Sequence, residues 1–435
     1  MQTTIIRNGR IVDPAQNIDG IYDIIIKDDI IAGIISANET DKVLKEKDNS
    51  IDATGLYVFP GFIDSHVHIR EPGAEALETI HSAARAAIAG GYSSIAAMPD
   101  TDPPVDNEAS AEYVYLQSER AGFANVFPIG ALTQGRKGKF LAEIGQLYYA
   151  NAVAFSDSPN AITDTSVMYK AMQYCGMFKR TVFVHPEDPY FTAKGVMNAG
   201  YNSAILGLPT RPEAAEEIMI SRDLLLSKYS NAHIHFSPIT TKGAVKLIKQ
   251  AKIDGINATA SVTPHHLLLT DDCVKTFNSS RAKVAPPLRT KEDIDVMIEA
   301  LQEGIIDVIC SMHTPCAYVD KTHDFIMSAF GVVGLETTVS MIFSRFVDTG
   351  ILDLNRFVEV FSTNPAKILK LSKRIGSLEK GKEANITIFD PNKEWTIDSS
   401  KFLSKSRNTA FEGEKTKGKA KFVFVKGRCF DCENL

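Results

Sequence analysis

Between residues 59 and 372 the chain alternates short apolar runs with helical patterns, and this alternation limits the fold more than any other feature. Short apolar runs bounded by turn signals are typical of buried parallel strands. Helical patterns lie between most of them, for example at 78–89, 212–226 and 242–251. Eight such units predict an α/β fold, a closed (β/α)8 barrel whose active site lies at the carboxyl ends of the strands. The predicted strands span 62–69, 93–98, 125–132, 152–155, 181–185, 232–236, 256–262 and 307–310.

The two chain ends have a different pattern, in which short β-rich runs alternate with turn signals. Asn8-Gly9 predicts a turn, and the polar run at 37–50 predicts a loop. Glycines and frequent lysines mark the last 60 or so residues as a solvated turn surface. The β-rich runs span 3–6, 22–26, 30–35, 384–389 and 421–426.

Composition excludes several classes of function. With 435 residues, 44% of them hydrophobic and 23% charged, the chain is typical of a soluble globular protein. A net charge of -6 gives no basic field for nucleic acid. No apolar run approaches the roughly 18 residues that span a bilayer, and the first residues do not resemble a signal peptide. Six scattered cysteines argue against a disulfide scaffold, and Cys429 and Cys432 are expected to be reduced thiols. We therefore expect a cytoplasmic protein.

His66-Val67-His68 ends the first predicted strand. Residues two apart on a strand point to the same side, so both imidazoles face one point at the strand end. Two histidines packed in a core also produce this pattern by chance. The motif therefore needs support from the other strands.

That support comes from the ends of other predicted strands. Asp157 follows the fourth strand and His185 ends the fifth. His233 and His235 both point inward on the sixth strand, and we favour His235 as the ligand. Nitrogen and oxygen donors that converge in this way suit Zn²⁺. Two ions would need a bridging carboxylate, for which Asp157 is the candidate.

Longer motifs occur along nearly the whole chain. They are Pro60-Gly61-Phe62-Ile63-Asp64, His66-Val67-His68-Ile69-Arg70-Glu71-Pro72-Gly73, Gly90-Gly91-Tyr92, Met98-Pro99-Asp100-Thr101, Thr263-Pro264-His265-His266, Pro286-Pro287-Leu288-Arg289, Phe330-Gly331-Val332-Val333-Gly334-Leu335-Glu336-Thr337, Asn364-Pro365-Ala366-Lys367 and Gly381-Lys382-Glu383-Ala384-Asn385. With these motifs, the sequence resembles the bacterial dihydroorotases of the amidohydrolase superfamily, the longer type related to allantoinase and dihydropyrimidinase. The resemblance implies a barrel at 59–372 and a small β-sandwich domain built from 1–58 and 373–435. It also implies a homodimer.

The resemblance also implies a site with one or two zinc ions. Arg70 would pair with the carboxylate of dihydroorotate, and Phe330 and Gly331 would close over its ring. In the family a metal-bound hydroxide attacks the ring amide, and a carboxylate at the end of strand 8 moves the proton. One ion would be held by His66, His68 and Asp157, and the other by Asp157, His185 and His235.

The proton-moving carboxylate is missing from this chain. Met312 stands in its place, and His313 and Pro315 fix the alignment there. A thioether carries no proton and is a poor zinc ligand among oxygen and nitrogen donors. No intact catalytic residue is therefore predicted.

Four further changes fall in the part of the site that reads the substrate. Cys316 replaces a histidine, and Asp100 an asparagine, that both contact the substrate carboxylate in the family. An ionised Asp100 would repel that carboxylate. Ala285 replaces an asparagine that bonds the ring, and Ser158-Pro159 replaces an Asp-Gly pair.

Three functions are consistent with this pattern. The first is a dihydroorotase-like cyclic amidohydrolase of pyrimidine biosynthesis, with activity weakened or lost. The second is an inactive homologue that serves as a scaffold for aspartate transcarbamoylase. The third is a hydrolase of a different cyclic amide, for which His313 would have to act as the base.

Overall fold

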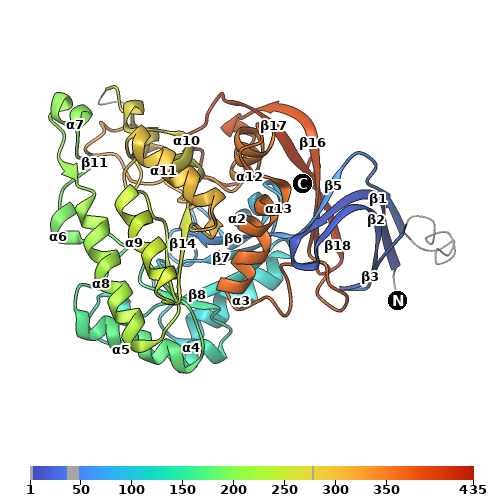
Figure 1. Ribbon diagram of the computed structural model, residues 1–435, viewed down its shortest axis with the longest axis horizontal. Coiled ribbons are helices and arrows are strands. Elements are labelled where there is room, and N and C mark those ends of the chain that lie inside the picture. The colour runs from blue at the N-terminus through green and yellow to red at the C-terminus, as the bar shows by residue number, and fades with distance from the viewer. Residues whose placement is uncertain (1–2, 37–48, 277–278) are drawn as a thin grey trace.

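A computed structural model describes residues 3–36, 49–276 and 279–435. Eight parallel strands stand side by side in chain order, and a bridge from Val67 to His313 joins the last strand's extension to the first. The predicted barrel is therefore confirmed (Figure 1). Its strands are β6 (Phe62–Val67), β7 (Tyr92–Ala97), β8 (Asn125–Gly130), β9 (Ala154–Ser156), β10 (Val182–Val184), β13 (Ile234–Phe236), β14 (Ala258–Val262) and β15 (Val308–Ile309).

Helices between the strands cover the barrel, and their ends follow from local sequence. Thr79 and Ser82 form a capping box at the first of them, and Asn107 and Ser110 form one at the second. The longer helices are α2 (Ile80–Ala89), α3 (Glu108–Ala121), α5 (Thr165–Met177), α8 (Ala214–Ser230), α9 (Lys242–Ile253) and α11 (Lys291–Gln302). The shorter ones are α4 (Ile144–Tyr149), α6 (Pro189–Thr192), α7 (Tyr201–Leu206), α10 (Pro264–Leu268), α12 (Thr338–Ile342), α13 (Leu354–Val358) and α14 (Asn364–Ile368), and β11 (Met197–Asn198) pairs with β12 (Thr210–Arg211) beside them.

Both chain ends contribute to a second sheet, which lies beside the barrel (Figure 1). Its strands follow the order β18-β17-β16-β5-β1-β2-β3, and β4 pairs with β1. Buried isoleucines such as Ile6, Ile11 and Ile24 form its core. The strands are β1 (Thr3–Asp13), β2 (Ile18–Lys27), β3 (Ile30–Ile35), β4 (Asn49–Asp52), β5 (Tyr57–Pro60), β16 (Ile386–Thr396), β17 (Lys415–Val425) and β18 (Arg428–Asp431).

One local prediction at the N-terminus was wrong, and the end of a second differs from the structure. Asn8 and Gly9 do not form a turn but lie inside β1, where the register with β2 shifts between Ile6 and Gly9. Asn8 has φ of 61°, so the dipeptide forms a bulge within one strand. The predicted loop at 37–50 lies mostly outside the described residues, but its end belongs to β4.

The connection between β16 and β17, residues 397–414, leaves the second sheet and crosses onto the barrel. We call it the strap. Backbone hydrogen bonds between Ile397 and the Gly413–Glu414 pair close its base. Ser406 Oγ lies 3.0 Å from both the Leu77 and the Cys316 carbonyl oxygens. The strap thus ties the second sheet to the loops at the barrel mouth.

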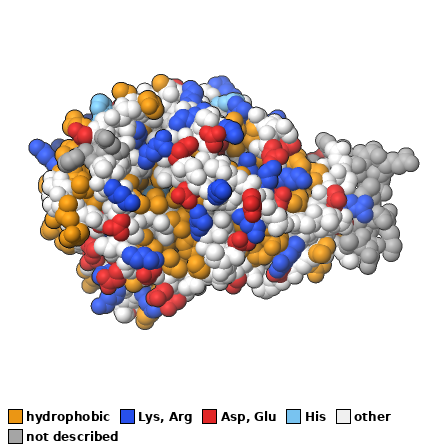
Figure 2. Space-filling view, turned by 90° about the horizontal axis from the view of Figure 1, so that it is seen from above, with side chains coloured by type: hydrophobic (Ala, Val, Ile, Leu, Met, Phe, Trp, Pro, Cys, Tyr) orange, Lys and Arg blue, Asp and Glu red, His pale blue; other side chains and the backbone are white. Residues whose placement is uncertain are grey.

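Figure 2 shows lysine and arginine side chains interspersed with acidic ones on the face displayed, rather than gathered in one basic patch. Within the described ranges, no helix combines the length and apolar character that crossing a membrane requires. The six cysteines are all free thiols.

Candidate active site

A cavity of about 160 Å³ opens at the carboxyl ends of the barrel strands. Because all eight strands run in parallel, the loops that follow them meet at this mouth. Its lining includes residues that the sequence analysis predicted for the site and others that it did not. The lining residues are His68, Arg70, Asp100, Pro159, His265, Val284, Ala285, Met312, Thr314, Phe330, Gly331 and Val332.

Three of the candidate zinc ligands each use one ring nitrogen to contact the protein. His66 Nδ1 lies 2.8 Å from Ser237 Oγ, and His235 Nδ1 lies 2.9 Å from Thr259 Oγ1. His185 Nε2 lies 3.2 Å from the carboxylate of Glu187. The other ring nitrogen of each is buried without a partner. One oriented and one free nitrogen is the arrangement that metal-binding histidines show.

The charge state of these histidines also suits ligation. Burial lowers the pKa of His66 well below its ordinary value, and neighbouring His68 adds to the effect. Burial does the same to His235. Both rings are therefore neutral at physiological pH, which is the form that binds a metal.

The bridging candidate Asp157 is held by the backbone. Its Oδ1 accepts hydrogen bonds from the amides of Leu132 at 2.9 Å and Thr133 at 3.0 Å, and its Oδ2 accepts one from the Thr133 hydroxyl. Burial raises its pKa. Within residues 3–36, 49–276 and 279–435, no three His, Cys, Asp or Glu side chains gather round one point as a metal centre. The histidine donors fit zinc in their chemistry, and ligation requires them to move closer together.

Arg70 is paired within the protein. Its Nη1 lies 2.8 Å from Asp100 Oδ2, and its Nε donates to the Pro315 carbonyl at 3.3 Å. His68 Nδ1 lies 2.8 Å from the same Asp100 oxygen, out of line for a hydrogen bond. Burial alone would raise the pKa of Asp100, but the His68 and Arg70 charges hold it well below its usual range. Asp100 is thus an ionised side chain inside the cavity.

Met312 lines the cavity and is only 8% exposed. Its φ is 48°, in the left-handed region that Asn and Asp tolerate better than other side chains do. The Thr314 hydroxyl donates to the Met312 carbonyl at 2.8 Å, which helps to hold this turn. The backbone at position 312 therefore has a conformation that an aspartate would adopt more readily than most side chains do.

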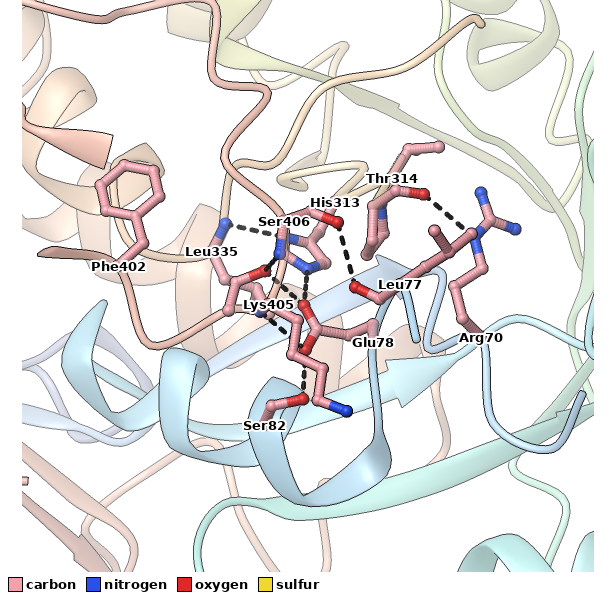
Figure 3. Close-up of polar contacts among 12 residues, drawn as sticks. Arg70, Leu77, Glu78, Ser82, His313, Thr314, Leu335, Phe402, Lys405 and Ser406 are labelled. Atoms are coloured by element: carbon pink, nitrogen blue, oxygen red, sulfur yellow. Dashed lines mark hydrogen bonds and ion pairs between the residues drawn. The ribbon is translucent and has the colours of Figure 1, made fainter. Parts of the chain in front are cut away.

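His313 cannot take over as the base in this arrangement. It is fully buried, with Nε2 3.3 Å from Glu78 and Nδ1 accepting from the Gly334 amide at 3.3 Å (Figure 3). Glu78 is itself bonded to Ser82 and Ser404. Both ring nitrogens of His313 are engaged, and it does not line the cavity. Through Glu78 it links the segment after β15 to helix α2 and the strap.

The remaining histidines differ in their free nitrogens. Both nitrogens of His233 are engaged, Nδ1 with Thr181 at 2.9 Å and Nε2 with Thr259 at 3.0 Å, which supports His235 as the candidate ligand. His265 and His266 lie in helix α10, which follows β14. His265 Nε2 is buried without a partner among the described residues, and this residue lines the cavity. The sequence analysis named His265 only within a motif and did not predict it at the site.

Phe330 and Gly331, which the resemblance implies close over a ring, lie in a loop that borders the cavity. The Arg211 guanidinium lies 4.3 Å from the centre of the Phe330 ring, and Lys283 Nζ lies 4.4 Å from it. Arg211 also reaches Glu187 at 2.6 Å, the carboxylate that contacts His185. Sequence reasoning missed Arg211 and Glu187, although Glu187 stands two residues after a candidate ligand.

Comparison with known proteins now decides the family. Residues 57–429 match the amidohydrolase family. The dihydroorotase of Ruminiclostridium cellulolyticum is 43% identical over 423 residues, 97% of each chain. This chain belongs to the dihydroorotases of the amidohydrolase family. The dihydroorotase of Syntrophus aciditrophicus is 40% identical over 98% of each chain. Among solved structures, the L-hydantoinase (dihydropyrimidinase) of Arthrobacter aurescens has a TM-score of 0.85 at 26% identity, over 99% of this chain and 96% of its own.

The sequence analysis named five places where this chain departs from what the family resemblance implies, and most of them lie at the cavity. Asp100, Pro159, Ala285 and Met312 all line it. Cys316 does not line it, and its thiol lies 3.4 Å from the Phe330 carbonyl oxygen.

Proposed function

We propose that this chain is a dihydroorotase-family protein that hydrolyses dihydroorotate weakly or not at all. The observation that carries the proposal is the ion pair between Arg70 and Asp100. The residue expected to bind the substrate carboxylate already has a carboxylate from its own chain. A second carboxylate placed beside Asp100 would meet a like charge in a largely buried site.

Loss of the base supports the same conclusion. Of the described residues that line the cavity, Asp100 alone carries a carboxylate. Its lowered pKa makes it a weak base. Met312 carries no titratable group, and His313 is engaged elsewhere. His265 also lies at the mouth with a free Nε2, but burial lowers its pKa well below the ordinary value, so it is a weak base as well. Among the described side chains at the mouth, none is therefore well suited to carrying a proton between nucleophile and leaving nitrogen.

We propose zinc as the metal, with His66, His68, His185 and His235 as its ligands and Asp157 joining them. Bound zinc would lower the pKa of a water to about 7 and polarise a ring carbonyl. The free nitrogens of His66, His185 and His235 support this assignment. The ion beside His66 and His68 should bind more weakly, because Met312 offers it no carboxylate.

The test is a dihydroorotate hydrolysis assay on protein whose zinc content has been measured. We expect turnover at least about a thousandfold below that of the Ruminiclostridium cellulolyticum dihydroorotase assayed in parallel, since general acid–base catalysis contributes roughly 10²–10⁴-fold. Turnover within tenfold of that relative, at equal zinc occupancy, would refute the proposal.

Two assembly predictions from the sequence accompany this proposal. A homodimer is expected, and light scattering at micromolar concentration that gives a monomer would refute it. The scaffold role predicts that the chain co-elutes with aspartate transcarbamoylase in size-exclusion chromatography. Separate elution at micromolar concentrations of both proteins would count against that role.

A further inference from the structure

Three polar atoms on residues that line the cavity have no hydrogen-bond partner among the described residues. One of them, His68 Nδ1, lies 2.8 Å from Asp100 Oδ2. The other two are Asp100 Oδ1 and His265 Nε2, and both are buried. The Asp100 side chain is 6% exposed and His265 is 3% exposed. Buried polar atoms without a partner are rare, because each forfeits hydrogen bonds to water. These two atoms therefore mark where a ligand would make its polar contacts.

The two atoms call for a particular kind of ligand group. A carboxylate oxygen can only accept hydrogen bonds, so Asp100 Oδ1 requires a donor such as a ring N–H. The other carboxylate oxygen is taken by Arg70 at 2.8 Å, so this pair contributes no net positive charge to the cavity. An unpaired Arg70 would bind a hydrogen-bond acceptor such as a substrate carboxylate. With Arg70 paired, the site instead offers the ligand a hydrogen-bond acceptor, Asp100 Oδ1.

The rest of the wall is mostly apolar. Val284, Ala285, Met312, Val332 and the Phe330 ring surround the two polar atoms. At about 160 Å³ the cavity is smaller than the roughly 300–1,000 Å³ typical of pockets for drug-sized ligands. A small flat ring suits such a space, with its faces against apolar side chains and its edge toward Asp100.

From this geometry we infer that the cavity takes a small uncharged cyclic amide or ureide, with a ring N–H donated to Asp100 Oδ1 and no carboxylate. This inference rests on the proposed function, since it names the ligand class of the same site. His265 Nε2 supplies a second polar contact at the ring edge. Binding is inferred without turnover, because the cavity still lacks a base.

The test uses two rings that differ only in the carboxylate. Binding of 5,6-dihydrouracil and of L-dihydroorotate is measured by titration calorimetry on the full chain with its zinc content known. We expect dihydrouracil to bind at least tenfold more tightly. In Asp100→Asn this preference should fall at least tenfold, because the amide no longer repels a carboxylate. Asp102→Asn, which removes an exposed carboxylate two residues away, should leave the preference unchanged.

Each outcome decides the inference without deciding the proposed function. Equal or tighter binding of dihydroorotate to the unmodified protein would overturn it, and so would an unchanged preference in Asp100→Asn. Failure of both rings to bind at millimolar concentration would also overturn it. The proposed function concerns turnover and is refuted only by the hydrolysis assay, so the two can fail separately. The comparison on unmodified protein holds even if a variant folds poorly.

Discussion

Arg70 and Asp100 are joined across the barrel mouth by an ion pair, with Nη1 2.8 Å from Oδ2. Arg70 follows β6 and Asp100 follows β7, so the pair links two adjacent strand ends. The Asp100 side chain is 6% exposed and that of Arg70 20% exposed. The pair therefore occupies the position at which the family resemblance places the substrate carboxylate.

Restoring the base alone should not restore activity. We expect Met312→Asp to fold, because its left-handed backbone suits aspartate, but to gain little turnover while Arg70 stays paired. Adding Asp100→Asn, Ala285→Asn and Cys316→His should yield measurable dihydroorotate hydrolysis, since each lost charged contact is worth roughly 1.5–3 kcal/mol. The hydrolysis assay compares the Met312→Asp variant with the variant that carries all four substitutions. Strong rescue by Met312→Asp alone would show that the ion pair is no obstacle.

Zinc content should depend on His235 and not on His233. Protein purified without chelator is expected to contain zinc, and His235→Ala should lower its affinity by about tenfold or more. His233→Ala is the matched control, one residue before the strand that carries His235, because both of its ring nitrogens already have protein partners. Metal analysis of the folded variants after dialysis measures the effect. Equal zinc loss in both variants would remove His235 from the ligand set.

Stability should depend on pH through Glu336. Burial raises its pKa to about 7, although hydrogen bonds from the Leu403 and Ser404 amides oppose the shift. The folded protein keeps a proton on Glu336 that the unfolded chain releases near pH 4.3. The contribution of Glu336 to the free energy of unfolding is therefore complete below about pH 4.3. It declines by roughly 1.4 kcal/mol per pH unit as the pH rises to about 7.

Glu336→Gln isolates that contribution, because the amide is similar in shape and does not titrate. Chemical denaturation of both proteins between pH 4.5 and pH 7.5 should show the unmodified protein losing stability relative to the variant as pH rises. Parallel curves would mean that Glu336 is ionised throughout this range.

Asn408 on the strap should hold the two loops that border the cavity. Its side chain donates to the carbonyl oxygens of Thr314 at 3.1 Å and Gly331 at 3.2 Å. Asn408→Ala leaves these groups unpaired, which should cost about 1–3 kcal/mol. It should also speed amide hydrogen exchange in both loops. The exposed Asn392→Ala serves as control, and unchanged exchange in Asn408→Ala would assign the loops' order to other contacts.

The barrel was predictable because its strands are apolar on both faces. Helices cover one side and the core fills the other, so apolar runs such as the one within Asn125–Gly130 stand out from their surroundings. The site residues followed from the strands, since parallel order brings the strand ends to one mouth. The prediction of a turn at Asn8-Gly9 was wrong because this dipeptide suits both a hairpin turn and a bulge within a strand.

The partners of the site residues were not predictable in the same way. Asp100 was expected to repel a substrate carboxylate, but its contact with Arg70 depends on where two loops meet in space. The partner of His313 is Glu78, which lies 235 positions away in the sequence. No periodic pattern links such residues, because packing of the finished barrel and the strap brings them together.

The strap has a consequence for how the chain is made. The loops at the barrel mouth bond to residues 397–414, which leave the ribosome after every barrel strand has already emerged. The second sheet is also completed late, because β5 pairs with β16 and cannot gain this partner until β16 has been synthesised. During synthesis the loops at the barrel mouth therefore lack their hydrogen bonds to the strap until the last part of the chain is added. Only then can the cavity take its final form.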